Sequence, residues 1–249
     1  MTYIVLLKKI GINPIIVHGG GPQIGEMLKK LNIKTEFIDG LRVTDEKTIN
    51  IVEMVLSGSI NKDLVTAINK QGGSAIGISG KDANLIEAKK IKKTKKTTDS
   101  NIEKILDLGH VGEAHKINPE LFIALEDTEI IPVIAPIGTD SNGQTFNINA
   151  DNVAGKLASS LNACKLIMLT DVDGIYNQDK ELISEISISQ INSLIKKSII
   201  NKGMIPKANT CVNAIDNGVI SAHILNGTIP HILLVEVFTE KGSGTMIID

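Results

Sequence analysis

The sequence predicts an α/β protein, an αβα sandwich in which helices enclose a mainly parallel sheet. Three observations support this class. Short apolar runs of strand length alternate along the chain with stretches whose apolar residues recur at helical spacing. Gly or Pro bounds several of these runs. The 249 residues, 42% hydrophobic and 22% charged, suffice for one large α/β domain or two small ones.

The same patterns place the elements in order. Continuous apolar runs predict buried strands at residues 15–18, 75–79, 130–135, 165–170 and 232–238. Helical spacing predicts helices over residues 24–31, 49–68 (ended by Gly72 and Gly73), 150–161 and about 204–217. A soft boundary near residues 140–143 separates two halves of one domain, roughly 1–145 and 146–249.

Composition argues against several classes of protein. A net charge of −2 gives no general attraction to nucleic acid or membranes, and 2% aromatic residues leave few platforms for base stacking. No apolar stretch approaches the ~18–20 residues of a membrane span. Cys164 and Cys211 share no motif spacing, so we expect buried free thiols in a reducing, cytoplasmic compartment. Abundant Lys, Ile and Asn suggest an AT-rich genome, such as that of a plastid or a reduced bacterium.

Arg42 is the one arginine among 26 basic residues. Where codon pressure favours lysine, a retained guanidinium indicates a task that lysine cannot perform. The candidate task is a two-pronged grip on a carboxylate. The alternative is a chance survivor on the surface.

The sharpest local motif is HGGGP. A predicted strand ends at His18, Gly19, Gly20 and Gly21 follow, and Pro22 occupies a favoured position at the start of a helix. Three glycines allow close backbone approach, and their N–H groups lie at the positive end of that helix. This predicts an anion cradle, although it is neither a Walker loop nor a dinucleotide motif. The alternative is a tight strand–helix turn.

A second group is Asn147, Asn149 and Asp151, which lead into the predicted helix over 150–161. Asn149 suits the N-cap and Asp151 suits the first turn, so both have a structural explanation. Asn147 has none. The three side chains could instead project together into a site, where they would bind a ligand or position nearby cations.

Two later positions also suggest a site for an anionic ligand. Thr170 and Asp171 end an apolar strand, and ligands of open α/β sheets bind beyond such ends, although a plain exit from the strand is equally open. Lys207 follows Pro206 in the first turn of a helix, where a cation opposes the helix dipole. A phosphate held there would remove this conflict, whereas the alternative is a stray surface lysine.

The five histidines show no metal-ligand spacing and no pairing with Ser or Cys, so we expect no metal site. They are His18, His110, His115, His223 and His231. The lack of an obvious general base fits one chemistry. A carboxylate acceptor with a pKa of about 4 is already ionised at pH 7, so phosphoryl transfer to it requires positioning and charge neutralisation, not proton removal.

Ten segments, in order over nearly the whole chain, resemble the acetylglutamate kinase family, which has the amino-acid kinase fold. They are GINPIIVHGGGPQIGEMLKKL, DGLRVTD, VEMVLSGSINK, GISGKDANLI, DLGHVGE, IPVIAPIG, FNINADNVAG, LTDVDGIY, KGMIPK and FTEKGSGTMI. The resemblance implies an αβα sandwich that uses ATP with Mg²⁺. It also implies phosphorylation of the side-chain carboxylate of N-acetyl-L-glutamate, a step of arginine biosynthesis.

Carried over to matching positions, the resemblance also implies roles for individual residues. Gly20 and Gly21 would bind the substrate through backbone N–H groups, Arg42 would hold its α-carboxylate, and Asn147 would grip it with Asn149 alongside. Lys207 would neutralise the transferring phosphoryl group and Asp151 would orient the catalytic lysines. The residues on the ATP side would be Asp171, Val172, Gly174, Tyr176 and Met204.

The N-terminus departs from the family pattern. Family members begin with a strand ending in Lys-x-Gly-Gly, whereas this sequence begins inside what resembles the following helix, MTYIVLLKKIG. A misassigned start is the favoured explanation. If the chain is complete, the sheet lacks an inner strand, and loss of one preorganised electrostatic group lowers the rate by ~10²–10³.

The C-terminal part resembles the arginine-inhibited branch of the family. Glu236 lies inside the apolar run HILLVEVF, where a buried carboxylate needs a partner. Feedback arginine, with His223 nearby, or a lysine salt bridge would supply one. The branch implies a homo-oligomer and, as in plastid and cyanobacterial relatives, a trimeric nitrogen-signalling partner. Two alternatives are a non-catalytic arginine- or ATP-binding regulator and an enzyme of the same fold that acts on a different acceptor.

Overall fold

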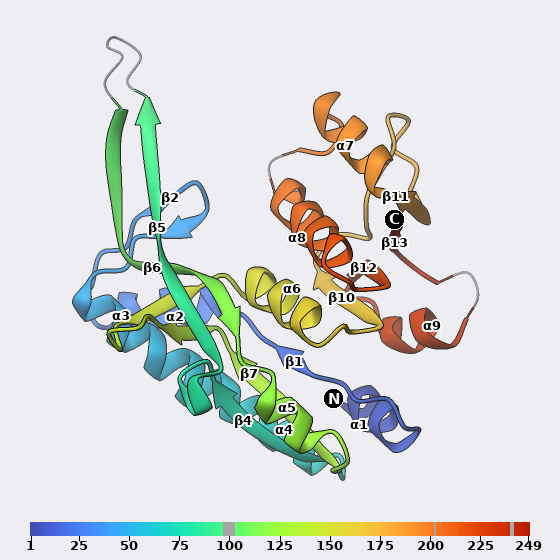
Figure 1. Cartoon of the computed structure of the whole chain (residues 1–249), viewed down its shortest axis with the longest axis horizontal. Helices are drawn as coiled ribbons and strands as arrows, with labels where there is room; N and C mark the ends of the chain where they lie inside the picture. The colour runs from blue at the N-terminus through green and yellow to red at the C-terminus, as the bar shows by residue number, and fades with distance from the viewer. Residues whose placement is uncertain (97–102, 202, 240–241) are drawn as a thin grey trace. The chain divides into compact units, whose positions relative to one another are not determined.

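The computed structural model describes residues 1–96, 103–201, 203–239 and 242–249 (Figure 1). The chain divides into two compact units, Met1–Val153 (unit 1) and Ala154–Asp249 (unit 2), and each is described by itself. Helices and strands alternate in both, so the α/β class is confirmed. The predicted boundary near residue 145 lies within unit 1, and the sheet predicted as one is found in the described residues as a separate sheet in each unit.

Unit 1 contains a parallel sheet, a helical layer and, among its described residues, three antiparallel hairpins. Its helical segments are α1 (Thr2–Lys9), α2 (Gly21–Lys30), α3 (Glu46–Glu53), the π-helix η1 (Met54–Ile60), α4 (Asn61–Lys70), the 3₁₀ turn η2 (Asp82–Asn84) and α5 (Glu120–Leu125). Its strands are β1 (Ile16–Val17), β2 (Phe37–Ile38), β3 (Leu41–Arg42), β4 (Ser74–Ser79), β5 (Ile86–Lys96), β6 (Glu103–Ile117), β7 (Ile130–Ala135), β8 (Ile137–Thr139) and β9 (Thr145–Ile148).

The parallel sheet of unit 1 has the strand order β1-β7-β4. The central strand β7 is nearly all buried, as its continuous apolar sequence predicts. Helices α1 and α4 pack on it through Val5 and Ile68, which contact Ile131 and Val133. The predicted strands at 15–18, 75–79 and 130–135 are therefore confirmed, with small differences at their ends.

The predicted long helix over 49–68 is found as the continuous run α3–η1–α4. It begins where the Asp45 carboxylate accepts a hydrogen bond from the Thr48 N–H at 2.7 Å. The π-helical turn η1 interrupts the α-helical period between Met54 and Ile60. Such turns are frequent at functional sites, and this one packs against the glycine loop described below.

Two of these hairpins flank the sheet of unit 1. Asp39 and Gly40 both have positive φ, at 49° and 79°, which matches the Asp-Gly turn favoured between paired strands. The longer β5–β6 hairpin extends beside it as a two-stranded ribbon (Figure 1), and β8 and β9 close its base into a four-stranded barrel. The lysine-rich segment 88–100, predicted as a solvated hairpin or loop, contributes its first residues to β5. Residues 97–100 lie outside the described residues.

Unit 2 packs helices on a four-stranded sheet with the order β10-β12-β13-β11. Its helices are α6 (Ala150–Ser160, which begins in unit 1), α7 (Ile188–Lys196), α8 (Met204–Asp216) and α9 (Ile232–Phe238), and its strands are β10 (Lys165–Thr170), β11 (Glu185–Ser187), β12 (Ser221–Asn226) and β13 (Thr245–Ile248). Strands β10 and β12 are parallel, and α8 contributes Ala208, Cys211 and Ala214 to the buried core beneath them.

Two predictions are wrong in unit 2. Residues 232–238 form helix α9, not a strand. Ile232 and Glu236, one helical turn apart, are both buried, at 5% and 8% exposure, so the run covers the core with one helical face. Apolar length alone does not separate a buried strand from a short buried helix. Cys211 is buried as expected, but Cys164 is exposed because it lies in the turn before β10.

Within the described part of the chain, no helix combines the length and the apolar character needed to cross a membrane.

Candidate active site

The HGGGP motif joins β1 to α2 in unit 1. Gly20 is the N-cap of α2 and Gly21 its first residue, so Pro22 lies at the second helical position, one later than predicted. In the part of the chain that the structure describes, no side chain caps this helix start, and no acidic residue lies in its first turn. As at every helix N-terminus, the first amides have no intrahelical partner. The backbone N–H groups and the helix dipole together form a place for an anion.

Close packing favours glycine at position 20. A Cβ at Gly20 would lie 2.7 Å from Leu56 Cδ2 and would also overlap Ile60, both on η1. Its φ of 179° is extended backbone, so conformational freedom is not the reason. A Cβ at Gly21, by contrast, would meet nothing within 4 Å. One side of the loop is therefore packed on η1, whereas the space beside Gly21 is open.

Arg42 lies directly against this loop. Its Nη2 donates to the Gly21 carbonyl at 3.0 Å and its Nη1 to the Thr35 hydroxyl at 2.7 Å. The Phe37 ring, opposite Arg42 in the β2–β3 hairpin, lies 4.5 Å from the guanidinium carbon. The residue is only 7% exposed, and burial lowers the pKa of its guanidinium. Because Arg42 is buried, the alternative that it is a surface residue is wrong. Among the described residues no carboxylate pairs with it, and its charge lies beside the start of α2.

The predicted NINAD group lies next to the same loop. A Cβ at Gly19 would lie 3.9 Å from the Cβ of Ala150, the first residue of α6, so the starts of α2 and α6 are adjacent. The Asn149 side chain accepts from the Asn152 N–H at 3.2 Å, which confirms it as a helix cap, and Asp151 lies in the first turn. Asn147 is half-buried in β9, where it pairs with Val111 and Ile137.

Unit 1 therefore brings five of the predicted residues to one place. Gly20, Gly21, Arg42, Asn149 and Asp151 lie around two adjoining helix starts, with Asn147 on the strand that leads into the second.

In unit 2, the parallel strands β10 and β12 end together, with Thr170 opposite Asn226. The loop after β10 carries Asp171 and Val172, both exposed. Asp173, which was not predicted, accepts from Asn226 Nδ2 and from the Tyr176 hydroxyl, each at 2.8 Å. These two hydrogen bonds lower the pKa of the Asp173 carboxyl, and the bond to Asp173 raises the pKa of Tyr176. The loop is thus ordered at the sheet edge where ligands of α/β folds bind.

The other predicted residues of the ATP side also belong to unit 2. Gly174 permits a close approach, because a Cβ there would lie 2.5 Å from Thr245 Oγ1. Helix α8 begins at Met204 and carries Lys207 in its first turn, which has no acidic residue, and none of the described side chains caps that end. A cation at the positive end of a helix dipole is the arrangement expected where a phosphate binds.

His223 and Glu236 form a buried pair. His223 Nδ1 lies 2.5 Å from one Glu236 carboxylate oxygen, and the other oxygen accepts from the Ser243 N–H at 2.9 Å. Burial, and then the Lys165 ammonium, lower the pKa of His223 despite the Glu236 carboxylate. The carboxylate therefore has partners within unit 2, and a histidine takes the place of the lysine that was considered as its partner.

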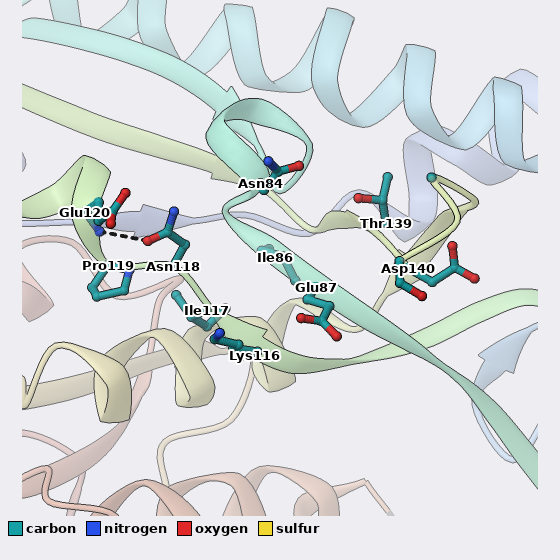
Figure 2. Close-up of a pocket in the computed structure, with 12 residues that line it drawn as sticks. Asn84, Ile86, Glu87, Lys116, Ile117, Asn118, Pro119, Glu120, Thr139 and Asp140 are labelled. Carbon is teal, nitrogen blue, oxygen red and sulfur yellow. Dashed lines mark hydrogen bonds between the residues drawn. The ribbon is translucent and has the colours of Figure 1, made fainter.

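The structure also contains a cavity of about 820 Å³ in unit 1 (Figure 2). It lies between the start of β5, the end of β6 and the turn after β8, and Glu87, Lys116, Glu120 and Asp140 are among its lining residues. None of the predicted site residues lines it. Among the described residues, no group of three or more His, Cys, Asp or Glu side chains could hold a metal ion.

Sequence reasoning missed the side chains that hold the site in place. Thr35 and Phe37 hold Arg42, and Asn61 contacts His18 at the start of the glycine loop. A signal existed for Phe37, because the Asp39-Gly40 turn between Phe37-Ile38 and Leu41-Arg42 predicts a hairpin with Phe37 opposite Arg42. Asn61 and His18 lie 43 residues apart, and nothing local in the sequence joins them.

The chain belongs to the amino acid kinase family, whose family model matches residues 1–226. The family implies a kinase that uses ATP, and this agrees with the α/β fold and with two helix starts suited to anions.

Within that family the chain is similar to acetylglutamate kinases. It is 54% identical over 244 residues to the enzyme named so from Rhodospirillum centenum, covering 98% of this chain and 80% of that one. Identity to the one from Ehrlichia chaffeensis is 56% over 247 residues, covering 99% and 77%. A solved N-acetylglutamate synthase from Neisseria gonorrhoeae, complexed with coenzyme A and N-acetyl-glutamate, superposes with a TM-score of 0.84 at 26% identity, where this chain covers 55% of that one.

Proposed function

We propose that this chain phosphorylates the side-chain carboxylate of N-acetyl-L-glutamate with ATP, giving N-acetyl-L-glutamyl 5-phosphate for arginine biosynthesis. Residues of roughly 1–145 bind the acceptor and residues of roughly 146–249 bind the nucleotide. The name shared by relatives at over half identity supports this acceptor. The N-acetyl-glutamate bound by the structural relative from Neisseria supports it further.

One observation carries the proposal. The single guanidinium of the chain is buried against the uncapped helix start at Gly21, beside the start of α6. N-acetyl-glutamate carries two carboxylates, so it needs two separate sites for negative charge. Arg42 would hold the α-carboxylate, while Gly20 and Gly21 N–H groups and the Asn147 amide, with Asn149 alongside, would hold the reacting end.

The chemistry needs no base in this chain. A side-chain carboxylate oxygen of the acceptor attacks the γ-phosphorus of ATP, the bond to the β–γ bridging oxygen breaks, and ADP leaves with that electron pair. The acceptor is already ionised near pH 7, so no proton has to be removed. Lys207 would neutralise charge on the transferring group and Asp151 would orient the catalytic lysines. Asp171, Val172, Gly174, Tyr176 and Met204 would hold the nucleotide, with Mg²⁺ bound to its phosphates.

Turnover with a panel of acceptors tests the proposal. ADP release and trapping of the acyl phosphate by hydroxylamine are measured with N-acetyl-L-glutamate, glutamate and carbamate. We expect product from N-acetyl-L-glutamate. Lys207→Ala should lower kcat by ~10²–10³ with little change in KM for the acceptor. The exposed Lys197→Ala is the matched control and should leave both unchanged.

Other outcomes point to the alternatives. Turnover of a different acceptor would assign the chain another activity of the same family. Binding of ATP or arginine without turnover of any acceptor would make it a regulator.

Finer features of the proposal go beyond the family relationship. Arginine would inhibit by binding at His223 and Glu236. Because these two side chains are hydrogen-bonded to each other, the guanidinium of the inhibitor would have to displace that hydrogen bond. The chain would form a homo-oligomer, bind a trimeric nitrogen-signalling protein, and act in the cytoplasm or a plastid stroma.

A further inference from the structure

The motif VEMVLSGSINK supplies no residue to the proposed reaction, yet it ends beneath the glycine loop. Its π-helical turn passes directly into α4 at Asn61, whose side chain is 1% exposed. A buried amide needs hydrogen-bond partners for all of its donors and acceptors, so its neighbours identify what it holds.

The Asn61 amide is fully engaged. Its oxygen lies 3.2 Å from the Lys62 ammonium, which also donates to the Gly77 carbonyl at 2.8 Å. This defines the other end as the NH₂ group, which lies 2.9 Å from the Val133 carbonyl and 3.2 Å from His18 Nε2. One donor therefore goes to β7 and the other to His18, the residue directly after β1.

This arrangement sets the proton position on His18. A ring nitrogen that accepts from an amide carries no proton, so the proton of the neutral ring is on Nδ1. Nδ1 lies 3.0 Å from the Gly19 carbonyl oxygen and donates to it. Burial lowers the pKa of His18, more than the Gly19 bond raises it, which agrees with a neutral ring. Lys62 is the charged side chain that this network places beside the pair.

The Gly19 carbonyl in turn controls the glycine loop. The carbonyl of Gly19 and the N–H of Gly20 belong to one planar trans peptide, so they point in opposite directions. A bond that fixes the carbonyl therefore fixes the Gly20 N–H, one of the groups proposed to hold the acceptor. The packing of Gly20 on Leu56 and Ile60 restrains the same peptide from the other side.

We propose that Asn61 is a positioning residue for the acceptor site: by donating to His18 Nε2 it holds the ring as the Nδ1–H tautomer, and that proton orients the peptide that presents the Gly20 N–H. The inference rests on the proposed function, because it takes the glycine amides as the place where the acceptor binds. A purely structural Asn61 would anchor α4 to β7 through Val133 and have no effect on the tautomer.

Asn61→Asp removes both donors, to His18 Nε2 and to the Val133 carbonyl, and the pH dependence of acceptor binding separates the two roles, because loss of the bond to Val133 does not vary with pH. A carboxylate cannot donate to Nε2, so His18 becomes fully satisfied only as the imidazolium, which donates from both nitrogens. The variant therefore raises the pKa of His18. Above that raised pKa the remaining proton is drawn to Nε2 by the carboxylate, and the bond to Gly19 is lost. Acceptor binding in the variant should then weaken as the pH rises.

The matched control is Asn69→Asp, on the same helix. Asn69 is exposed and its side-chain oxygen accepts from the Ala75 N–H at 2.8 Å, a role that a carboxylate keeps. Two quantities are measured for each protein between about pH 5.5 and 8.5. One is the ¹⁵N NMR spectrum of the His18 ring, identified by its loss in His18→Gln. The other is the Kd for N-acetyl-L-glutamate.

We expect the unsubstituted chain and Asn69→Asp to show a predominantly neutral Nδ1–H ring above about pH 6.5, with a Kd that is steady there. Asn61→Asp should show the imidazolium at the low end, and its Kd should rise at least about tenfold toward the high end. A pH-independent Kd for Asn61→Asp, whether equal to that of the unsubstituted chain or uniformly weaker, would overturn the inference.

An Nε2–H ring in the unsubstituted chain would also overturn it, and this readout needs no variant to fold. If the chain shows the Nδ1–H ring but binds no N-acetyl-L-glutamate, the proposed function fails while the Asn61–His18 arrangement stands.

Discussion

Arg42→Lys keeps the charge at the proposed acceptor site and removes only the geometry of the guanidinium. Arginine has five N–H donors, and two of its nitrogens already hold Thr35 and the Gly21 carbonyl. Enough donors remain for both oxygens of a carboxylate. A lysine ammonium has three donors, so after the same two bonds it can give a carboxylate only one.

The expected size of the effect follows from that count. Loss of one hydrogen bond between charged groups costs about 1.5–3 kcal/mol, which corresponds to roughly a 10- to 100-fold change in binding. KM for N-acetyl-L-glutamate should rise by this factor. KM for ATP should stay within about twofold, because the predicted nucleotide residues belong to unit 2. The variant should still fold, because lysine can keep the bonds to Thr35 and Gly21.

The assay is steady-state kinetics with each substrate varied in turn, supported by calorimetric titration of N-acetyl-L-glutamate. Lys93→Arg is the control. Lys93 forms an ion pair with Asp39, which lies in the turn of the β2–β3 hairpin that carries Arg42, and the Lys93 side chain is 30% exposed. It should change neither KM. An unchanged KM for the acceptor in Arg42→Lys, or an equal rise of both KM values, would refute the assigned role of Arg42.

Three further predictions concern stability. Gly20→Ala should lower the free energy of unfolding, measured by urea titration, by about 1–3 kcal/mol, because the added methyl group would overlap η1. Gly21→Ala should lower it much less, and equal losses in the two variants would contradict the packing argument. Burial and Lys165 lower the pKa of His223 in the folded chain, so the unfolded chain binds a proton on this histidine more tightly. The free energy of unfolding should therefore fall as the pH drops below about 6.5. His223→Gln should reduce this dependence of stability on pH, whereas the exposed His115→Gln should not. Asn149→Ala should cost about 1 kcal/mol by removing the cap of α6, whereas Asn149→Ser should retain most of it, and equal stability of the two would exclude a capping role.

Local sequence determined much of this protein. The helix start in the HGGGP motif, the Asn149 cap of α6, the largely apolar strands β7 and β10, and the glycine-rich turn between β1 and α2 were predicted, because each depends on residues within a few positions of one another. Composition alone made the single arginine unusual, and the structure shows that Arg42 is buried, whereas its role in binding a carboxylate stays a prediction.

Contacts between distant segments determined the rest. Only the tertiary structure made residues 232–238 a helix, since the same apolar run can cover a core in either conformation. Only the tertiary structure joined Asn61 to His18, 43 residues away, and to Val133, 72 residues away. A residue's chemical type and its near neighbours fix what it can donate or accept, but the partner that it meets is set by how the chain folds back on itself.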